Sequence, residues 1–161
     1  MGSHTARTAA FGFIAGAVAV LVFHQVGFLV LTQLGVLTAK TYSLAPTPPW
    51  GVPQVISSAF WGGVWGVVAS FVLRRRPGVF ASVVLRQRAG GANPLAWIVF
   101  GGTLPVLVAW FIVQPLKGLP AGGGFHMPAV LAVPLVHAFW GFGMWVVMQV
   151  LRQLSGRAVA A

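Results

Sequence analysis

The chain contains no aspartate, no glutamate and no cysteine among its 161 residues. Without side-chain carboxylates, it lacks the groups that most often serve as general acid, intramembrane proton carrier or hard-metal ligand. Without cysteine, it can form no disulfide, no thiol nucleophile and no thiolate metal site. The sequence therefore offers no catalytic constellation and no metal site, and we expect a protein that is not an enzyme.

Charge is scarce, and all of it is positive. Charged residues make up 6% of the chain against 58% hydrophobic residues, and ten lysines and arginines give a formal net charge of +10. Because soluble domains carry about a quarter charged residues, we expect a protein whose solvent is the bilayer. The bases flank apolar runs, which favours contact with anionic lipids or with acidic groups on other membrane subunits, and argues against a nucleic-acid partner.

Four apolar runs are each long enough to cross a bilayer, and together they account for most of one domain, residues 1–161. They lie at about 11–34, 53–73, 94–116 and 128–151. The expected fold class is an all-α membrane protein, a four-helix transmembrane bundle. Within the third run, the Gly101-Gly102 pair and Pro105 predict a kink or a non-standard turn.

Positive residues gather on one side of the four predicted spans. Eight of the ten lie there: Arg7, Arg74, Arg75, Arg76, Arg86, Arg88, Arg152 and Arg157. Lys40 and Lys117 lie on the other side. The positive-inside rule then places both termini in the cytoplasm. The loop at 74–93 is basic and cytoplasmic, and its arginines are candidates for lipid or partner contact. Within it, residues 78–92 form either a short interfacial helix or an ordinary loop.

Glycines in the first two spans are spaced for close helix packing. Gly12 and Gly16 form one GxxxG pair, and Gly62 and Gly66 form another. A pair of this kind presents a flat helix face on which a neighbouring backbone can lie closely. We therefore predict that these four glycines are helix-packing residues.

The second span resembles the fourth. The stretch from Ser58 to Gly62 (Ser-Ala-Phe-Trp-Gly) is echoed by the stretch from His137 to Gly141 (His-Ala-Phe-Trp-Gly). If the echo reflects duplication, the chain is two tandem helical hairpins related by a pseudo-twofold axis along the membrane normal. Shared composition is the alternative explanation, because alanine, glycine and tryptophan are frequent in this chain.

Two of the few polar side chains inside the predicted spans are histidines. Counting about 1.5 Å per residue from the span ends places His24 and His137 each roughly 3 Å outside the midplane. They would face each other if the first and fourth spans adjoin. Three interpretations stay open: helix packing through hydrogen bonds, ligation of a haem or chlorin, and proton transfer or substrate contact. Gln25, Ser58 and Thr103 are further candidates for polar contact with a substrate.

Several stretches of the first half resemble a known group of proteins. They are residues 13–17 (Phe-Ile-Ala-Gly-Ala), residues 23–25 (Phe-His-Gln), residues 48–53 (Pro-Pro-Trp-Gly-Val-Pro) and residues 60–66 (Phe-Trp-Gly-Gly-Val-Trp-Gly). Together they resemble small uncharacterised four-span membrane proteins of proteobacteria. The resemblance implies the fold and a location in the inner membrane of a bacterium, and it implies no activity.

Three functions are compatible with these observations. The first is a non-catalytic accessory or assembly subunit of a larger integral membrane complex, motivated by uncompensated positive charge and small-residue helix faces. The second is a small transporter or channel for an anion, a lipid or a neutral solute, using the interrupted third span and the polar residues near the midplane. The third is a haem- or pigment-binding membrane protein that uses His24 and His137.

Overall fold

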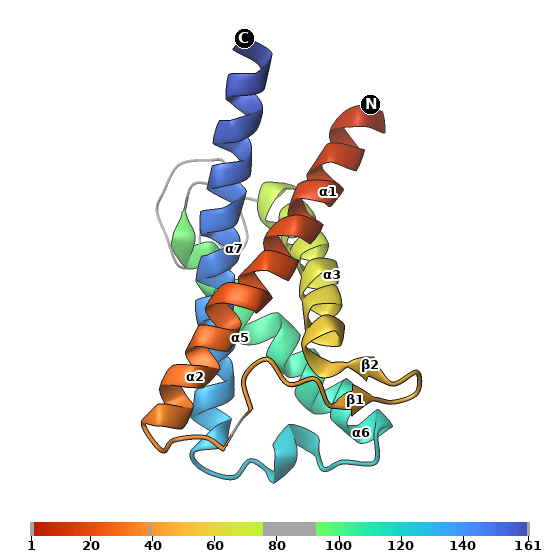
Figure 1. Cartoon of the computed structure of the whole chain (residues 1–161), viewed down its shortest axis with the longest axis vertical. Helices are drawn as coiled ribbons and strands as arrows, with labels where there is room; N and C mark the ends of the chain where they lie inside the picture. Colours follow the sequence, from red (N-terminus) through yellow and green to blue (C-terminus); the bar gives the residue numbers. More distant parts are fainter. Residues whose placement is uncertain (1, 39, 76–92, 161) are drawn as a thin grey trace.

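The computed structural model describes residues 2–38, 40–75 and 93–160 (Figure 1). In this part of the chain, four helices are long and apolar enough to cross a membrane: His4–Gln33, Gln54–Leu73, Pro94–Leu116 and Ala129–Gly156. The predicted all-α four-helix architecture is confirmed. The first helix begins at Gly2, well before the apolar run, because the polar residues that precede the run contain no helix-breaking proline.

The helical elements follow one another in four groups. The first is α1 (Gly2–Ala19), η1 (Val20–His24) and α2 (Gln25–Gln33), which form one continuous path, and the second is α3 (Gln54–Arg75). The third is α5 (Pro94–Val108), η2 (Ala109–Val113) and α6 (Gln114–Leu116), and the last is the short η3 (Ala121–Gly124) followed by α7 (Ala129–Ala160). Asn93 caps α5 by accepting a hydrogen bond from the Leu95 N–H at 3.0 Å.

The bundle consists of two hairpins that are joined through α1 and α7. Helix α1 packs along α3, and α5 packs along α7. The path from α1 to α2 also crosses α7, as Figure 1 shows in red, orange and blue. Helices α3 and α5 touch less extensively, for example through the rings of Trp65 and Phe100, whose centroids are 6.2 Å apart. Both termini lie at the same end of the bundle.

Each hairpin is held by direct backbone contact at glycines. A side chain at Gly16 would collide with the carbonyl oxygen of Gly62, and one at Gly66 would collide with the carbonyl oxygen of Gly12. Between α5 and α7, a side chain at Gly101 would similarly meet the backbone of Gly141. Because close packing is a main source of helix association in lipid, these glycines set the spacing within each hairpin.

The core lies where the four long helices meet. Its buried residues are Ala15, Ala19, Val20, Ala69, Trp97, Phe100, Trp140, Met144 and Met148. Its alanines come from α1 and α3, and its tryptophans and methionines come from α5 and α7.

Two of the long helices contain a π-helical turn. One is η1, which runs from Val20 to His24, and the other is η2, which runs from Ala109 to Val113. The third span does contain a non-standard turn, but η2 lies towards the end of the span and not at the Gly101-Gly102 pair or Pro105, where it was predicted. Pro105 lies inside regular helix, where its carbonyl still accepts a hydrogen bond from the Ala109 N–H.

The connection between α2 and α3 is fastened to the bundle. Strands β1 (Pro46–Thr47) and β2 (Val52–Pro53) pair antiparallel as a small hairpin, with Trp50 at its turn 86% exposed. The backbone N–H groups of Gln54 and Val55 donate to the carbonyls of Ala45 and Ser43 at 2.9 and 3.0 Å. The loop thereby satisfies two of the free donors at the start of α3.

The predicted basic segment is only partly covered by the described residues. Arg74 and Arg75 end α3. Arg76, Arg86 and Arg88 lie outside the described residues, as does the stretch predicted as either an interfacial helix or a loop.

Candidate functional site

The two intramembrane histidines face each other. The rings of His24, at the end of η1, and His137, on α7, have centroids 5.0 Å apart and planes at 89°. A second ring contact joins His24 to Phe28 one turn later, with centroids 4.7 Å apart. The first and fourth spans do adjoin, and the structure brings together the two residues that the sequence placed at a common depth.

The two imidazoles differ in their hydrogen bonding. Nδ1 of His137 lies 2.9 Å from the carbonyl oxygen of Val133 in the preceding turn, to which it donates in the tautomer protonated at Nδ1. Nδ1 of His24 is buried and has no partner among the described residues. A buried polar atom without a partner is costly, so His24 is the member of the pair that calls for an explanation.

A tyrosine from the loop holds the helix beside His24. The hydroxyl of Tyr42 donates to the carbonyl of Leu21, inside the π-helical turn, at 2.8 Å. The backbone N–H of Tyr42 donates to Oε1 of Gln25 at 2.7 Å. Gln25 is only 6% exposed, and this bond to the loop gives its buried amide oxygen a hydrogen-bond partner. Tyr42 was not predicted as a site residue, and its being the single tyrosine of the chain was the only available signal.

The other predicted polar candidates come from different helices. The hydroxyl of Thr103 donates to the carbonyl of Val99 in its own helix, α5, at 2.6 Å, and its side chain is exposed. Ser58 is half-buried on α3. The histidine pair is built from η1 and α7, so Thr103 and Ser58 belong to other helices than the pair.

A second polar contact ties the two hairpins together. Nε1 of Trp140 on α7 donates to the backbone carbonyl of Gly16 on α1 at 3.0 Å, and the bond is buried. Gly16 is the same residue that touches Gly62 of α3. Trp140 therefore closes the junction at which three helices meet.

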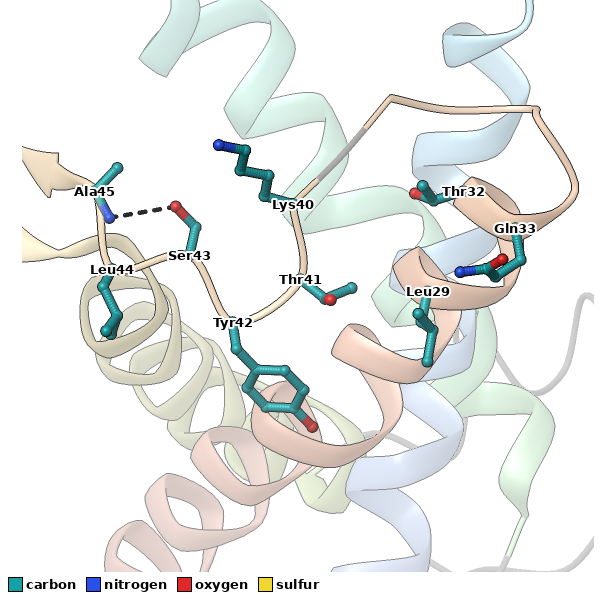
Figure 2. Close-up of a pocket in the computed structure, with 9 residues that line it drawn as sticks. All are labelled: Leu29, Thr32, Gln33, Lys40, Thr41, Tyr42, Ser43, Leu44 and Ala45. Atoms are coloured by element: carbon teal, nitrogen blue, oxygen red, sulfur yellow. Dashed lines mark hydrogen bonds between the residues drawn. The ribbon is translucent and has the colours of Figure 1, made fainter.

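An open cavity of about 520 Å³ lies between the end of α2 and the loop that follows it (Figure 2). We call it the loop-end cavity. Its lining residues are Leu29, Thr32, Gln33, Lys40, Thr41, Tyr42, Ser43, Leu44 and Ala45. The lining combines one cationic side chain with hydroxyl and amide groups, and Tyr42 links the cavity wall to the helix that carries His24.

The donor set of the histidine pair limits what it can hold. In the described part of the chain, no group of three or more histidine, cysteine or carboxylate side chains lies close enough to share a metal ion. Two imidazoles on opposite faces of one haem iron would have centroids roughly 6 Å apart, given iron–nitrogen distances of about 2 Å. The 5.0 Å separation is shorter, so the rings as they lie do not fit a haem iron between them.

A scan against protein-family models, a search of curated proteins and a search of solved structures each found no match. The resemblance to four-span proteins of proteobacteria therefore stays a prediction. The functional interpretation rests on the contacts within this chain.

Proposed function

We propose that the protein is a non-catalytic accessory or assembly subunit of a larger integral membrane complex. The observation that carries the proposal is the use of its polar groups. Trp140 on α7 donates to Gly16 on α1, and Tyr42 in the loop donates to Gln25 on α2. Polar groups engaged in this way hold helices together, and no side-chain carboxylate exists in the sequence to support acid–base chemistry.

The charge of the chain favours an acidic counterpart. The net charge is +10, and the sequence has no acidic side chain to neutralise any of it. Acidic groups on a neighbouring membrane subunit, or anionic lipid headgroups, would relieve the repulsion among the arginines at 74–88. We therefore place the partner's contact at the end of the bundle where α3 finishes.

Site-specific photo-crosslinking tests the position of that contact. A photoreactive amino acid at position 76 should form one discrete adduct with an acidic membrane protein in native membranes. The same amino acid at position 50, in the turn of the β1–β2 hairpin, should form none. Equal adducts from both positions, or adducts with lipid alone at position 76, would contradict the accessory role.

We also propose an inner-membrane location with both termini in the cytoplasm. The eight-to-two distribution of positive residues supports this orientation. The chain has no cysteine, so single-cysteine variants report topology directly. A membrane-impermeant maleimide added to spheroplasts should label Trp50→Cys and leave Ser155→Cys unlabelled until the membrane is permeabilised. The opposite pattern would reverse the orientation.

Nδ1 of His24, which has no partner in the part of the chain that the structure describes, favours a second candidate, a small transporter or channel for an anion, a lipid or a neutral solute. Reconstituted flux of such a solute would then fall on His24→Ala or His137→Ala. His126→Ala is the matched control, because His126 is exposed outside the spans. An absorption spectrum of the same purified sample tests pigment binding, and a Soret or chlorin band would favour that function over both others.

A further inference from the structure

The loop-end cavity is a site that neither the accessory role nor the histidine pair uses. Its volume of about 520 Å³ lies within the range of small-molecule sites in proteins, which is about 300–1,000 Å³. In the view of Figure 2, Lys40 and Ser43 leave the loop in the same direction, while Leu29, Thr32 and Gln33 come from the end of α2. We propose that this cavity binds the phosphodiester headgroup of an anionic phospholipid.

The chemistry of the lining favours an anion. Lys40 carries three N–H donors and a positive charge, and Thr32, Thr41 and Ser43 add hydroxyl groups to the lining. The sequence has no carboxylate side chain that could compete for the lysine. Donors without a neighbouring anionic acceptor are the set that phosphate oxygens require.

The number of cations favours a phosphodiester over a phosphate monoester. Lys40 is the one cationic side chain in the lining, and a phosphodiester carries one negative charge. A monoester approaches two negative charges near neutral pH, so a single lysine would leave part of that charge uncompensated. The charge of the site therefore matches the diester that links a lipid headgroup to its glycerol.

The walls of the cavity favour a lipid over a soluble diester. Leu29 and Leu44 line it and are both exposed, so they offer apolar surface to an acyl chain. The β1–β2 hairpin beside it carries the exposed Trp50, a residue type that lies at the headgroup level of membranes. A cavity at this depth lies where phospholipid headgroups are found.

The loop that forms the cavity is held in place before any ligand binds. Tyr42 is bonded to Leu21 and Gln25 on one side. The carbonyls of Ser43 and Ala45 accept hydrogen bonds from the start of α3 on the other side. A loop fixed by four hydrogen bonds loses little further entropy when a ligand binds. A few hydrogen-bond donors are therefore sufficient to bind the headgroup.

Native mass spectrometry of the delipidated full-length protein tests the proposal. Phosphatidylglycerol and phosphatidylcholine with the same acyl chains are added separately, and the bound fraction is measured. We expect wild type to bind phosphatidylglycerol more tightly. Lys40→Gln should weaken that binding about five-fold, the effect of one lysine near a lipid phosphate, and leave phosphatidylcholine unchanged. Lys40→Arg should restore it.

Lys117→Gln is the matched control, because Lys117 is exposed in the loop after α6 and does not line the cavity. It should bind phosphatidylglycerol as wild type does. Equal loss in Lys40→Gln and Lys117→Gln, or equal binding of the two lipids by wild type, would overturn the proposal. A separate competition experiment uses deacylated phosphatidylglycerol, which is a soluble diester. If it displaces phosphatidylglycerol at an equal concentration, the ligand is a soluble diester and not a lipid. Thermal unfolding of each variant checks that it folds.

Discussion

The indole of Trp140 donates a hydrogen bond to the backbone carbonyl of Gly16 at 3.0 Å, across the boundary between the two hairpins. The same glycine lies against Gly62 of its own hairpin. Three of the four long helices thus meet at one residue without a side chain. Because the junction combines close packing with a buried hydrogen bond, we expect it to be the most sensitive point of the fold.

Trp140→Phe tests the hydrogen bond. The substitution keeps an aromatic ring but removes the N–H, leaving the Gly16 carbonyl without this donor. We expect a loss of at least about 1 kcal/mol in the free energy of unfolding, because the variant loses a polar contact between membrane helices and also part of a buried ring system. Trp61→Phe is the control, because Trp61 is 58% exposed, and it should change little. Denaturant titration in detergent micelles measures both, and equal losses would contradict the account.

Gly16→Ala tests the close backbone approach. Its new methyl group would collide with the carbonyl of Gly62, so the two helices of the hairpin must separate. The expected cost is about 1–3 kcal/mol, as for other overpacked sites. Gly156→Ala in α7 meets no atom of the described residues within 4 Å, and it should be neutral or stabilising through helix propensity. A neutral Gly16→Ala variant would show that the hairpin is not packed through its glycines.

His24→Leu separates a packing role from a functional one. Nδ1 of His24 makes no hydrogen bond among the described residues, so its replacement by an apolar residue of similar size removes a buried polar atom that has no partner. We expect the free energy of unfolding to stay unchanged or to rise by about 1 kcal/mol. A clear loss, with exposed His126→Leu unchanged, would show that His24 serves mainly to hold the helices.

Tyr42→Phe tests the fastening of the loop. The hydroxyl donates to the carbonyl of Leu21 beside the histidine pair, and the variant loses only this bond. Hydrogen exchange in residues 40–45 should become several-fold faster, since one such bond contributes about 1 kcal/mol. Exchange at the start of α7, which this bond does not touch, should stay as in wild type. Unchanged exchange in both segments would show that the loop is held without Tyr42.

The four spans were predictable because the bilayer imposes their length and composition. Prolines and arginines near the ends of the apolar runs gave bounds close to the observed ones, except at the start of the first helix and at the end of the fourth, which continues to Ala160. The spacing of Gly12, Gly16, Gly62 and Gly66 also gave the face on which α1 and α3 meet, since helical periodicity alone determines which residues share a face.

The histidine pair was only half predictable. Counting residues gives depth, which placed His24 and His137 at one level. Which helices adjoin depends on how all four pack, and only the structure shows that the first and fourth spans bring the two rings together. The bond from Trp140 to Gly16 depends in addition on the rotation of α7. The π-helical turns have no sequence signature. The hydrogen bonds of Tyr42 depend on the path of its loop, which cannot be predicted from composition.

The sequence echo between the second and fourth spans does not align the residues that make equivalent contacts in the two hairpins. The sequence aligns His137 with Ser58. In the structure, however, Gly101 meets the backbone of His137 and Gly141 as Gly16 meets that of Gly62 and Gly66. The contacts therefore match His137 with Gly62, one helical turn from the sequence alignment. The tandem repeat stays a prediction, and the two hairpins are alike in their use of glycine contacts.

The most direct test of the accessory role is purification of the tagged chain from native membranes in a mild detergent. We predict a complex with an acidic membrane protein in a fixed stoichiometry that dissociates as salt is raised, because screening weakens the contacts of the arginines. Replacement of Arg74, Arg75 and Arg76 by glutamine should release the partner at low salt, and Lys117→Gln should not. Recovery of the chain as a lone, detergent-stable species with solute flux of its own would contradict the account.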